Sequence, residues 1–304
     1  MKKITIVIPM SPEGKIDALE STKKQKNVKI IVVRGLNPSR NRNIGIEKAG
    51  TEFIAFINGH TILSENWGMK LEEFFKEHPE IDMVGGPQLN YGGDNNFTQA
   101  SGYALGSVFG GGNINKRYKK GKLNLNADET SLTSANLICR KRVLQKVKFD
   151  EKIYPGEDPK FISDSIKAGF KVAYSPDIIV YNRRRGSFLR LTKQIYNYGV
   201  TRPKKERFAE TLKMPFFIIP SLFLIYVVLI VFLIIIGRLN LLVLIPAIFY
   251  ILLNFYFSFI NSIKNKDIAS FFLLLIIHPT IHLSYGLGFL ISTIKNNLKG
   301  HIKE

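Results

Sequence analysis

The chain has 304 residues, a formal net charge of +19 and hydrophobic residues at 45% of its positions. Apolar residues gather in the C-terminal third, where Pro215–Gly237 and Leu241–Ile260 contain no charge, so we expect an integral membrane protein rather than a wholly soluble one. Cys139 is the only cysteine, which excludes an intramolecular disulfide and fits a reducing compartment.

Basic residues cluster between Arg183 and Arg207, directly before the first apolar segment. A basic surface can bind nucleic acid, but basic clusters beside a membrane span are typical of the cytoplasmic side and attract anionic lipid. We therefore expect membrane lipid as a partner and no nucleic acid.

The N-terminal part alternates short apolar strands with helices. Strands are predicted at residues 3–9, 28–33, 52–58, 132–139 and 171–176, and helices at 17–25, 39–49, 66–76, 141–148 and 157–167. This alternation predicts a mostly parallel sheet with both faces covered. Ligands of such sheets bind at the carboxyl ends of strands, which here are Pro9–Glu13, Arg34–Arg42 and Asn58–His60.

Glu157 and Asp158 begin the helix predicted at 157–167. Acidic groups in a first turn interact favourably with the helix dipole and the free N–H groups. The local sequence is therefore compatible with a structural role as a helix cap as well as with a functional role. Trp67, the only tryptophan, is interpreted as a core residue.

Four segments in order resemble glycosyltransferase family 2, the inverting nucleotide-sugar enzymes, and within it the succinoglycan-type membrane glycosyltransferases. They are ITIVIP, SRNRNIGIEKAGTEFIAFINGH, SANLICRKRVLQKVKFDE followed by GED, and RLTKQIYNYG. The resemblance implies an α/β catalytic domain of GT-A fold, Rossmann-like with a mostly parallel sheet, followed by an α-helical transmembrane region.

The resemblance also implies the catalytic and donor-binding residues. An inverting transfer needs a base that removes the proton of the acceptor hydroxyl, and the family match places that role on Asp158, with Glu157 beside it. Donor-binding residues are expected to be Pro9, Glu13, Arg34, Arg40, Arg42 and Asn43. Arg34 stands where the family commonly has an aspartate that contacts the nucleotide base. The three arginines are interpreted either as ligands of the diphosphate or as ordinary surface charges.

Asn58 and His60 correspond to the family's metal motif, usually Asp-x-Asp and in this branch often Asp-x-His. An amide oxygen coordinates a hard cation without bringing a charge, and imidazole suits Mn²⁺ better than Mg²⁺. We expect a divalent cation, Mn²⁺ or Mg²⁺, to bind more weakly here than in an ordinary member, or not at all.

Gln194, Asn197 and Tyr198 match a family element that resembles Gln-x-x-Arg-Trp and imply contacts with the acceptor. The same stretch is compatible with an amphipathic interfacial helix whose Leu191, Ile195 and Tyr198 face lipid. Both interpretations hold together if the acceptor is lipid-linked.

The predicted organisation has three parts. Residues 1–200 form the cytosolic GT-A domain, 201–214 a basic interfacial linker, and 215–294 the membrane region, with segments at about 215–237, 241–260 and 268–294. The positive-inside rule favours a re-entrant or strongly kinked third segment bent at Pro279, with a plain third span as a near-equal alternative. His278 and His282 beside it are interpreted as satisfying each other or backbone carbonyls rather than as a metal site.

The predicted function is transfer of a sugar from a nucleotide-sugar donor to a lipid-linked or other membrane-bound glycan acceptor, by a multi-pass protein of the cytoplasmic membrane. The alternative is a membrane-tethered binding or scaffold protein without catalysis. Glu157 and Asp158 favour the enzyme, whereas Asn58 and Arg34 favour the alternative.

Overall fold

The computed structural model describes residues 4–184, 186–205 and 211–301. The chain forms two compact units: residues 1–92 and 113–183 make unit 1, and residues 93–112 and 184–304 make unit 2. This division differs from the predicted boundary at residue 200, because residues 93–112 pack with the C-terminal helices and the chain leaves unit 1 after Arg183.

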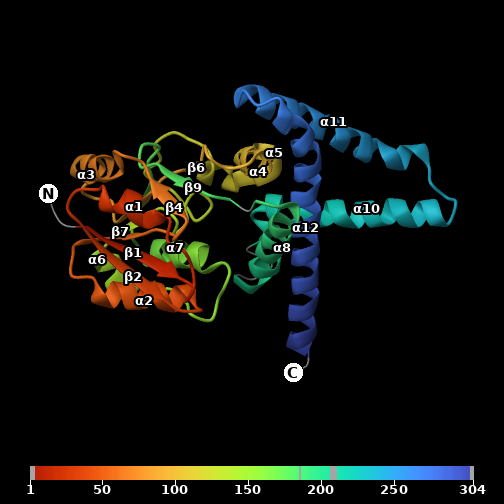
Figure 1. The fold of residues 1–304 in the computed structure, drawn as a ribbon. Coiled ribbons are helices and arrows are strands. Elements are labelled where there is room, and N and C mark those ends of the chain that lie inside the picture. The colour runs from red at the N-terminus through yellow and green to blue at the C-terminus, as the bar shows by residue number, and fades with distance from the viewer. Residues whose placement is uncertain (1–3, 185, 206–210, 302–304) are drawn as a thin grey trace. The chain divides into compact units, whose positions relative to one another are not determined.

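Unit 1 is built on a sheet of six strands in the order β2-β1-β3-β7-β5-β8 (Figure 1). The strands are β1 Ile4–Met10, β2 Val28–Arg34, β3 Phe53–Phe56, β5 Met83–Gly85, β7 Leu137–Arg140 and β8 Val172–Tyr174. All pairs are parallel except the two that β7 makes with β3 and β5. The predicted mostly parallel sheet is therefore confirmed.

A smaller sheet of three strands, not predicted from the sequence, lies beside the first in unit 1. Its order is β4-β9-β6, with β4 Thr61–Leu63, β9 Val180–Asn182 and β6 Gln88–Asn90. Strand β4 begins directly after His60, so the chain enters the second sheet immediately after the third predicted rim segment, Asn58–His60.

Helices cover both faces of the six-stranded sheet. They are α1 Ala18–Lys23, α2 Pro38–Lys48, α3 Trp67–Glu77, α6 Lys141–Lys146 and α7 Glu157–Lys167, and a 3-10 helix spans Gly112–Arg117. Side chains of β1 alternate between two cores: Ile6 packs with α1 and α3, whereas Val7 packs with α2, α6 and α7. Trp67 is fully buried in the first core, which confirms its interpretation as a core residue.

Helix α2 carries the second predicted rim segment, and both its N-cap and its packing against β1 hold it in place. Its N-cap Asn37 accepts a hydrogen bond from the Arg40 backbone N–H at 3.1 Å, and Pro38 follows as the first helical residue. A Cβ atom at Gly45 would lie 2.3 Å from Val7, so only glycine lets α2 approach β1 this closely.

Among the residues described, unit 2 contains helices joined by turns and no strand. Its helices are α4 Asn96–Gly106, α5 Val108–Gly111, α8 Phe188–Lys205, the 3-10 helix Pro215–Phe217, α10 Ile219–Ile235, α11 Leu241–Lys264 and α12 Ala269–His301. Helices α8 and α12 pack backbone to backbone: a Cβ atom at Gly199 would lie 2.2 Å from the Tyr285 carbonyl oxygen. Leu191 and Ile195 of α8 are buried in this packing, so the expectation that they face lipid is wrong.

Helix α12 runs without interruption through Pro279, so the expected hairpin at this proline is wrong. Proline lacks an N–H, which leaves the carbonyl four residues earlier without its helical partner. That carbonyl, of Leu275, accepts a hydrogen bond from Nδ2 of Asn254 on α11 at 2.9 Å. A neighbouring helix therefore satisfies the group that would otherwise favour a break.

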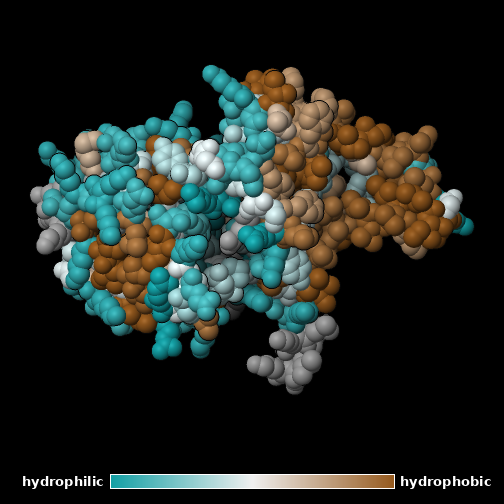
Figure 2. Space-filling model, viewed as in Figure 1, coloured by the Kyte–Doolittle hydropathy of each residue, from teal (hydrophilic) through white to brown (hydrophobic). Residues whose placement is uncertain are grey.

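Among the described residues, two helices are long and apolar enough to cross a membrane, Leu241–Lys264 and Ala269–Asn296, and Ile219–Ile235 is a shorter apolar helix. Large apolar side chains stay exposed along α10 and α11, among them Ile235, Leu241 and Phe249. Figure 2 shows these helices as a nearly continuous hydrophobic surface. Length and composition are therefore compatible with the second and third predicted spans, whereas the first predicted span corresponds to the shorter helix.

Candidate functional site

The carboxyl ends of β1, β2 and β3 meet at one edge of the six-stranded sheet. Met10 pairs with Arg34 in the β1–β2 register, and the Gly35 backbone N–H donates to the Met10 carbonyl at 2.9 Å. The turn after β3 is joined to the same edge, because the Ala18 N–H donates to the Gly59 carbonyl at 2.9 Å. The three rim segments predicted from the strand pattern are thus contiguous.

A buried arginine connects this edge to the start of α7. Nη1 of Arg42 lies 3.0 Å from Oε1 of Glu157, and Nη2 lies 3.6 Å from Oδ1 of Asp158. The same Nη2 donates to Oδ1 of Asn58 at 3.4 Å, and the guanidinium carbon lies 5.2 Å from the ring centre of Phe149. The structure therefore brings together four of the predicted site residues: Arg42, Asn58, Glu157 and Asp158.

Glu157 is buried and paired with Arg42. Its side chain is 7% exposed and that of Arg42 is 4% exposed. Burial raises the pKa of the Glu157 carboxyl, the charge of Asp158 raises it further, and the Arg42 guanidinium opposes both effects. Glu157 is thus an anchor for Arg42 rather than a group open to a ligand.

Asp158 is placed differently from its neighbour. Its side chain is 18% exposed, and its Oδ2 accepts a hydrogen bond from the Ser134 backbone N–H at 3.1 Å. Its Oδ1 is buried next to the Arg42 guanidinium and has no hydrogen-bond partner among the described residues. The N-cap of α7 is Gly156, and no side chain caps the helix. The carboxylate is therefore oriented by Ser134 through one oxygen and faces Arg42 with the other.

The predicted donor-binding residues differ in what they contact. Arg34 Nη1 donates to three backbone carbonyls of the loop after β1. Asn43 uses its amide to hold the Phe149 backbone, donating to its carbonyl at 2.9 Å and accepting from its N–H at 3.1 Å. Arg40 lies exposed on α2 and Glu13 exposed in the loop after β1. Pro9, near the end of β1, is half-buried. Their predicted contacts with a donor stay predictions.

The side chains around Asn58 do not by themselves make a cation site. The Asn58 amide oxygen faces the Arg42 guanidinium, and a second positive charge there would be repelled. Among the residues described, no three His, Cys, Asp or Glu side chains gather as metal ligands. His60, half-buried directly before β4, would be the remaining ligand.

Gln194, Asn197 and Tyr198, the predicted acceptor-binding residues, lie on α8 of unit 2. Nε2 of Gln194 donates to the Tyr198 hydroxyl at 2.7 Å, one helical turn away. The pair forms a preordered polar patch on α8. Its role toward an acceptor remains a prediction.

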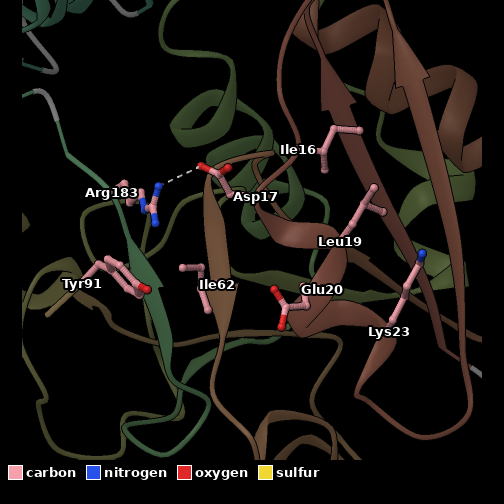
Figure 3. Close-up of a pocket in the computed structure, with 8 residues that line it drawn as sticks. All are labelled: Ile16, Asp17, Leu19, Glu20, Lys23, Ile62, Tyr91 and Arg183. Carbon is pink, nitrogen blue, oxygen red and sulfur yellow. Dashed lines mark ion pairs between the residues drawn. The ribbon is translucent and has the colours of Figure 1, made fainter. Parts of the chain in front are cut away.

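Sequence reasoning missed Ser134 and a surface hollow of unit 1. Ser134 lies within the SANLICRKR segment that carried the family resemblance, but no motif marked its backbone N–H. The hollow has a volume of about 510 Å³ (Figure 3). It is lined by Ile16, Leu19, Glu20, Lys23, Ile62 and a trio made of Arg183 and its two partners, Asp17 and Tyr91. In that trio Arg183 stacks on Tyr91 at 4.7 Å and pairs with Asp17 at 3.6 Å.

The two histidines of α12 have hydrogen-bond partners within unit 2. Nε2 of His282 lies 2.7 Å from the Phe109 carbonyl oxygen, and its Nδ1 lies 2.8 Å from the Tyr250 hydroxyl. Nδ1 of His278 lies 3.0 Å from Oδ1 of Asn254. Their interpretation as polar groups satisfied within the protein agrees with these contacts, although neither histidine satisfies the other.

Comparison with known proteins finds a family match within the N-terminal half of the chain. Residues 11–148 match the model of the family described as Glycosyl transferase family 2. No curated protein matches the chain.

Several solved structures are similar in fold at low identity. One is Staphylococcus (S.) aureus TarS 1-349, at 14% identity and a TM-score of 0.45 over 66% of this chain and 65% of that chain. The same fragment in complex with UDP-GlcNAc matches at 15% identity and 0.43, over 66% of each chain. Another is the mannosyltransferase PcManGT from Pyrobaculum calidifontis in complex with GDP-Man and Mn²⁺, at 10% identity and 0.48, over 65% and 62%. This chain covers less than two thirds of the length of each of these proteins.

Proposed function

We propose that the chain is an inverting member of glycosyltransferase family 2 that transfers a sugar from a nucleotide-sugar to a membrane-bound acceptor. The observation that carries the proposal is the arrangement at the edge of the sheet. Ser134 and Arg42 orient the Asp158 carboxylate, which is more exposed than that of the adjacent Glu157. The family match over residues 11–148 supports the donor class.

In the proposed reaction, the Asp158 carboxylate accepts the proton of the acceptor hydroxyl as the hydroxyl oxygen forms a bond to the anomeric carbon. The bond between the anomeric carbon and the diphosphate oxygen breaks, and its electron pair leaves with the nucleoside diphosphate. A positioned carboxylate of this kind typically accelerates transfer by about 10²–10⁴-fold. Glu157 is unsuited to this role because it is buried and already engaged by Arg42.

The membrane part of the proposal rests on unit 2. Two of its helices are long and apolar enough to span a bilayer, and α10 and α11 expose apolar side chains that lipid would cover. An enzyme anchored in this way meets acceptors that share the membrane, and a polyprenyl-linked glycan is the acceptor we propose. The basic residues of α8, such as Arg190 and Lys193, are exposed and would meet anionic headgroups on the cytosolic side.

The test is a screen of nucleotide-sugars against the detergent-solubilised full chain. Donor binding is read as thermal stabilisation, and transfer as a mass increase of one sugar on lipid-linked glycans in a membrane extract. We expect at least one donor to stabilise the protein and to support transfer. Stabilisation without transfer to any extract would favour the scaffold alternative, and the absence of any response would refute the donor class.

A further inference from the structure

Arg34 occupies a fixed position at the ligand-binding edge of unit 1. It is the last residue of β2, opposite Met10 of β1. The turn that follows it is held by Asn41 of α2, whose Nδ2 donates to the Met10 carbonyl at 3.1 Å and to the Gly35 carbonyl at 3.0 Å. The backbone that carries Arg34 is thus joined to two neighbouring elements.

The guanidinium of Arg34 is oriented through one nitrogen only. Its Nη1 donates to the carbonyls of Ser11 at 3.2 Å, Pro12 at 2.9 Å and Gly14 at 3.0 Å. Within the described residues, Nε and Nη2 make no hydrogen bond and no carboxylate pairs with this side chain. The fork formed by Nε–H and Nη2–H is therefore fixed in direction and exposed to solvent.

A fork of two parallel N–H donors is complementary to two adjacent acceptors. Guanine offers such a pair in N7 and O6, the commonest partner of arginine on a base edge. Cytosine offers another in N3 and O2. Uracil and adenine offer none, because uracil places N3–H between its two carbonyls and adenine places an amino group beside N7 and N1.

In a strand-helix-strand nucleotide site, a residue about 20 positions after the first turn, near the end of the second strand, contacts the ribose. Arg34 ends the second strand of the β1-α1-β2 unit of this chain, so we expect the nucleoside within its reach. We propose that Arg34 reads the base of the donor nucleotide and selects guanine or cytosine over uracil and adenine. This inference rests on the proposed function and adds the nucleotide class of its donor.

The test compares four nucleoside diphosphates, GDP, CDP, UDP and ADP, by titration calorimetry on the solubilised full chain. We expect GDP or CDP to bind at least about tenfold more tightly than UDP and ADP, since a bidentate base contact typically discriminates by this factor or more. Arg34→Lys keeps the charge but loses the fork, and it should bring the four affinities within about threefold of one another.

A matched control, Arg238→Lys, makes the same chemical change in the turn before α11 and should leave the preference unchanged. Tighter or equal binding of UDP or ADP would overturn the inference while leaving the proposed function intact. An equal loss for all four in Arg34→Lys would also overturn it, since Arg34 would then contact phosphate or only hold the loop. If none of the four binds, the proposed function fails first.

Discussion

Replacing Arg42 by methionine tests the electrostatics of the site. Arg42→Met keeps a side chain of similar length among Phe149 and its neighbours but leaves Glu157 buried without its cation. Both partners are more than nine-tenths buried, so solvent screening is slight. Breaking a buried pair by removing one partner typically costs about 3–5 kcal/mol, because the remaining charge is uncompensated.

The cost should depend on pH in one direction. In the variant, burial and Asp158 raise the pKa of Glu157 with no opposing guanidinium. A carboxyl whose pKa is raised by folding destabilises the protein above its folded pKa, and this effect disappears as pH falls below its unfolded value of about 4.5. The loss should therefore be largest at neutral pH and shrink toward pH 4.

The assay is thermal unfolding of wild type and variant in detergent across this pH range. At neutral pH a loss of 3–5 kcal/mol corresponds to a fall in Tm of roughly 6–20 °C. Adding Glu157→Gln to Arg42→Met should restore part of the loss, since it removes the uncompensated charge. A fall that is the same at every pH, or that Glu157→Gln deepens, would refute the reasoning.

Three further predictions address the base, the metal and the membrane. Asp158→Asn should reduce transfer by about 10²–10⁴-fold with donor affinity retained, whereas Asp164→Asn, on the same helix and paired with Lys160, should leave transfer unchanged; near-normal transfer by the first variant would remove Asp158 from the mechanism. Asn58→Asp should strengthen the response of donor binding to Mn²⁺ by adding a charged ligand, and titrations in which both forms ignore Mn²⁺ would count against any cation there. A cysteine introduced as Leu239→Cys, in the turn before α11, should react with an impermeant thiol reagent on intact cells, and protection until lysis would reverse the proposed orientation.

The sequence predicted those parts of the fold that follow a regular pattern. Strands β1, β2 and β3 and helices α2, α3 and α7 appear close to their predicted bounds, because β-branched runs and apolar spacing mark them directly. The strand predicted at 132–139 is only Leu137–Arg140, since residues 131–136 form turns in which the Asn136 N–H donates to the Thr133 carbonyl. Strands of three residues, such as β4 and β9, are too short to show a period.

For the site, the sequence predicted residue types but not their pairing. The order of motifs placed Asp158 and Arg42 in one region, yet the contact between Arg42 and Glu157 joins positions 115 residues apart. Nothing local distinguishes the buried Arg42 from the exposed Arg40 two residues earlier; the turn of α2 decides it. The role of the Ser134 backbone N–H depends on loop geometry alone, which no side-chain pattern records.

Because residues 93–112 belong to unit 2, unit 1 cannot be separated from the rest of the protein by a single truncation. Phe109 of this segment stacks on Phe257 of α11 with ring centres 5.1 Å apart, and its carbonyl lies against His282 of α12. A fragment ended after residue 183 would keep this segment but lose the helices that cover it, and its bare aromatic surface would drive aggregation. A soluble fragment of unit 1 therefore has to be engineered by two cuts, with a polar bridge from Gly92 to Asn113 in addition to the C-terminal truncation.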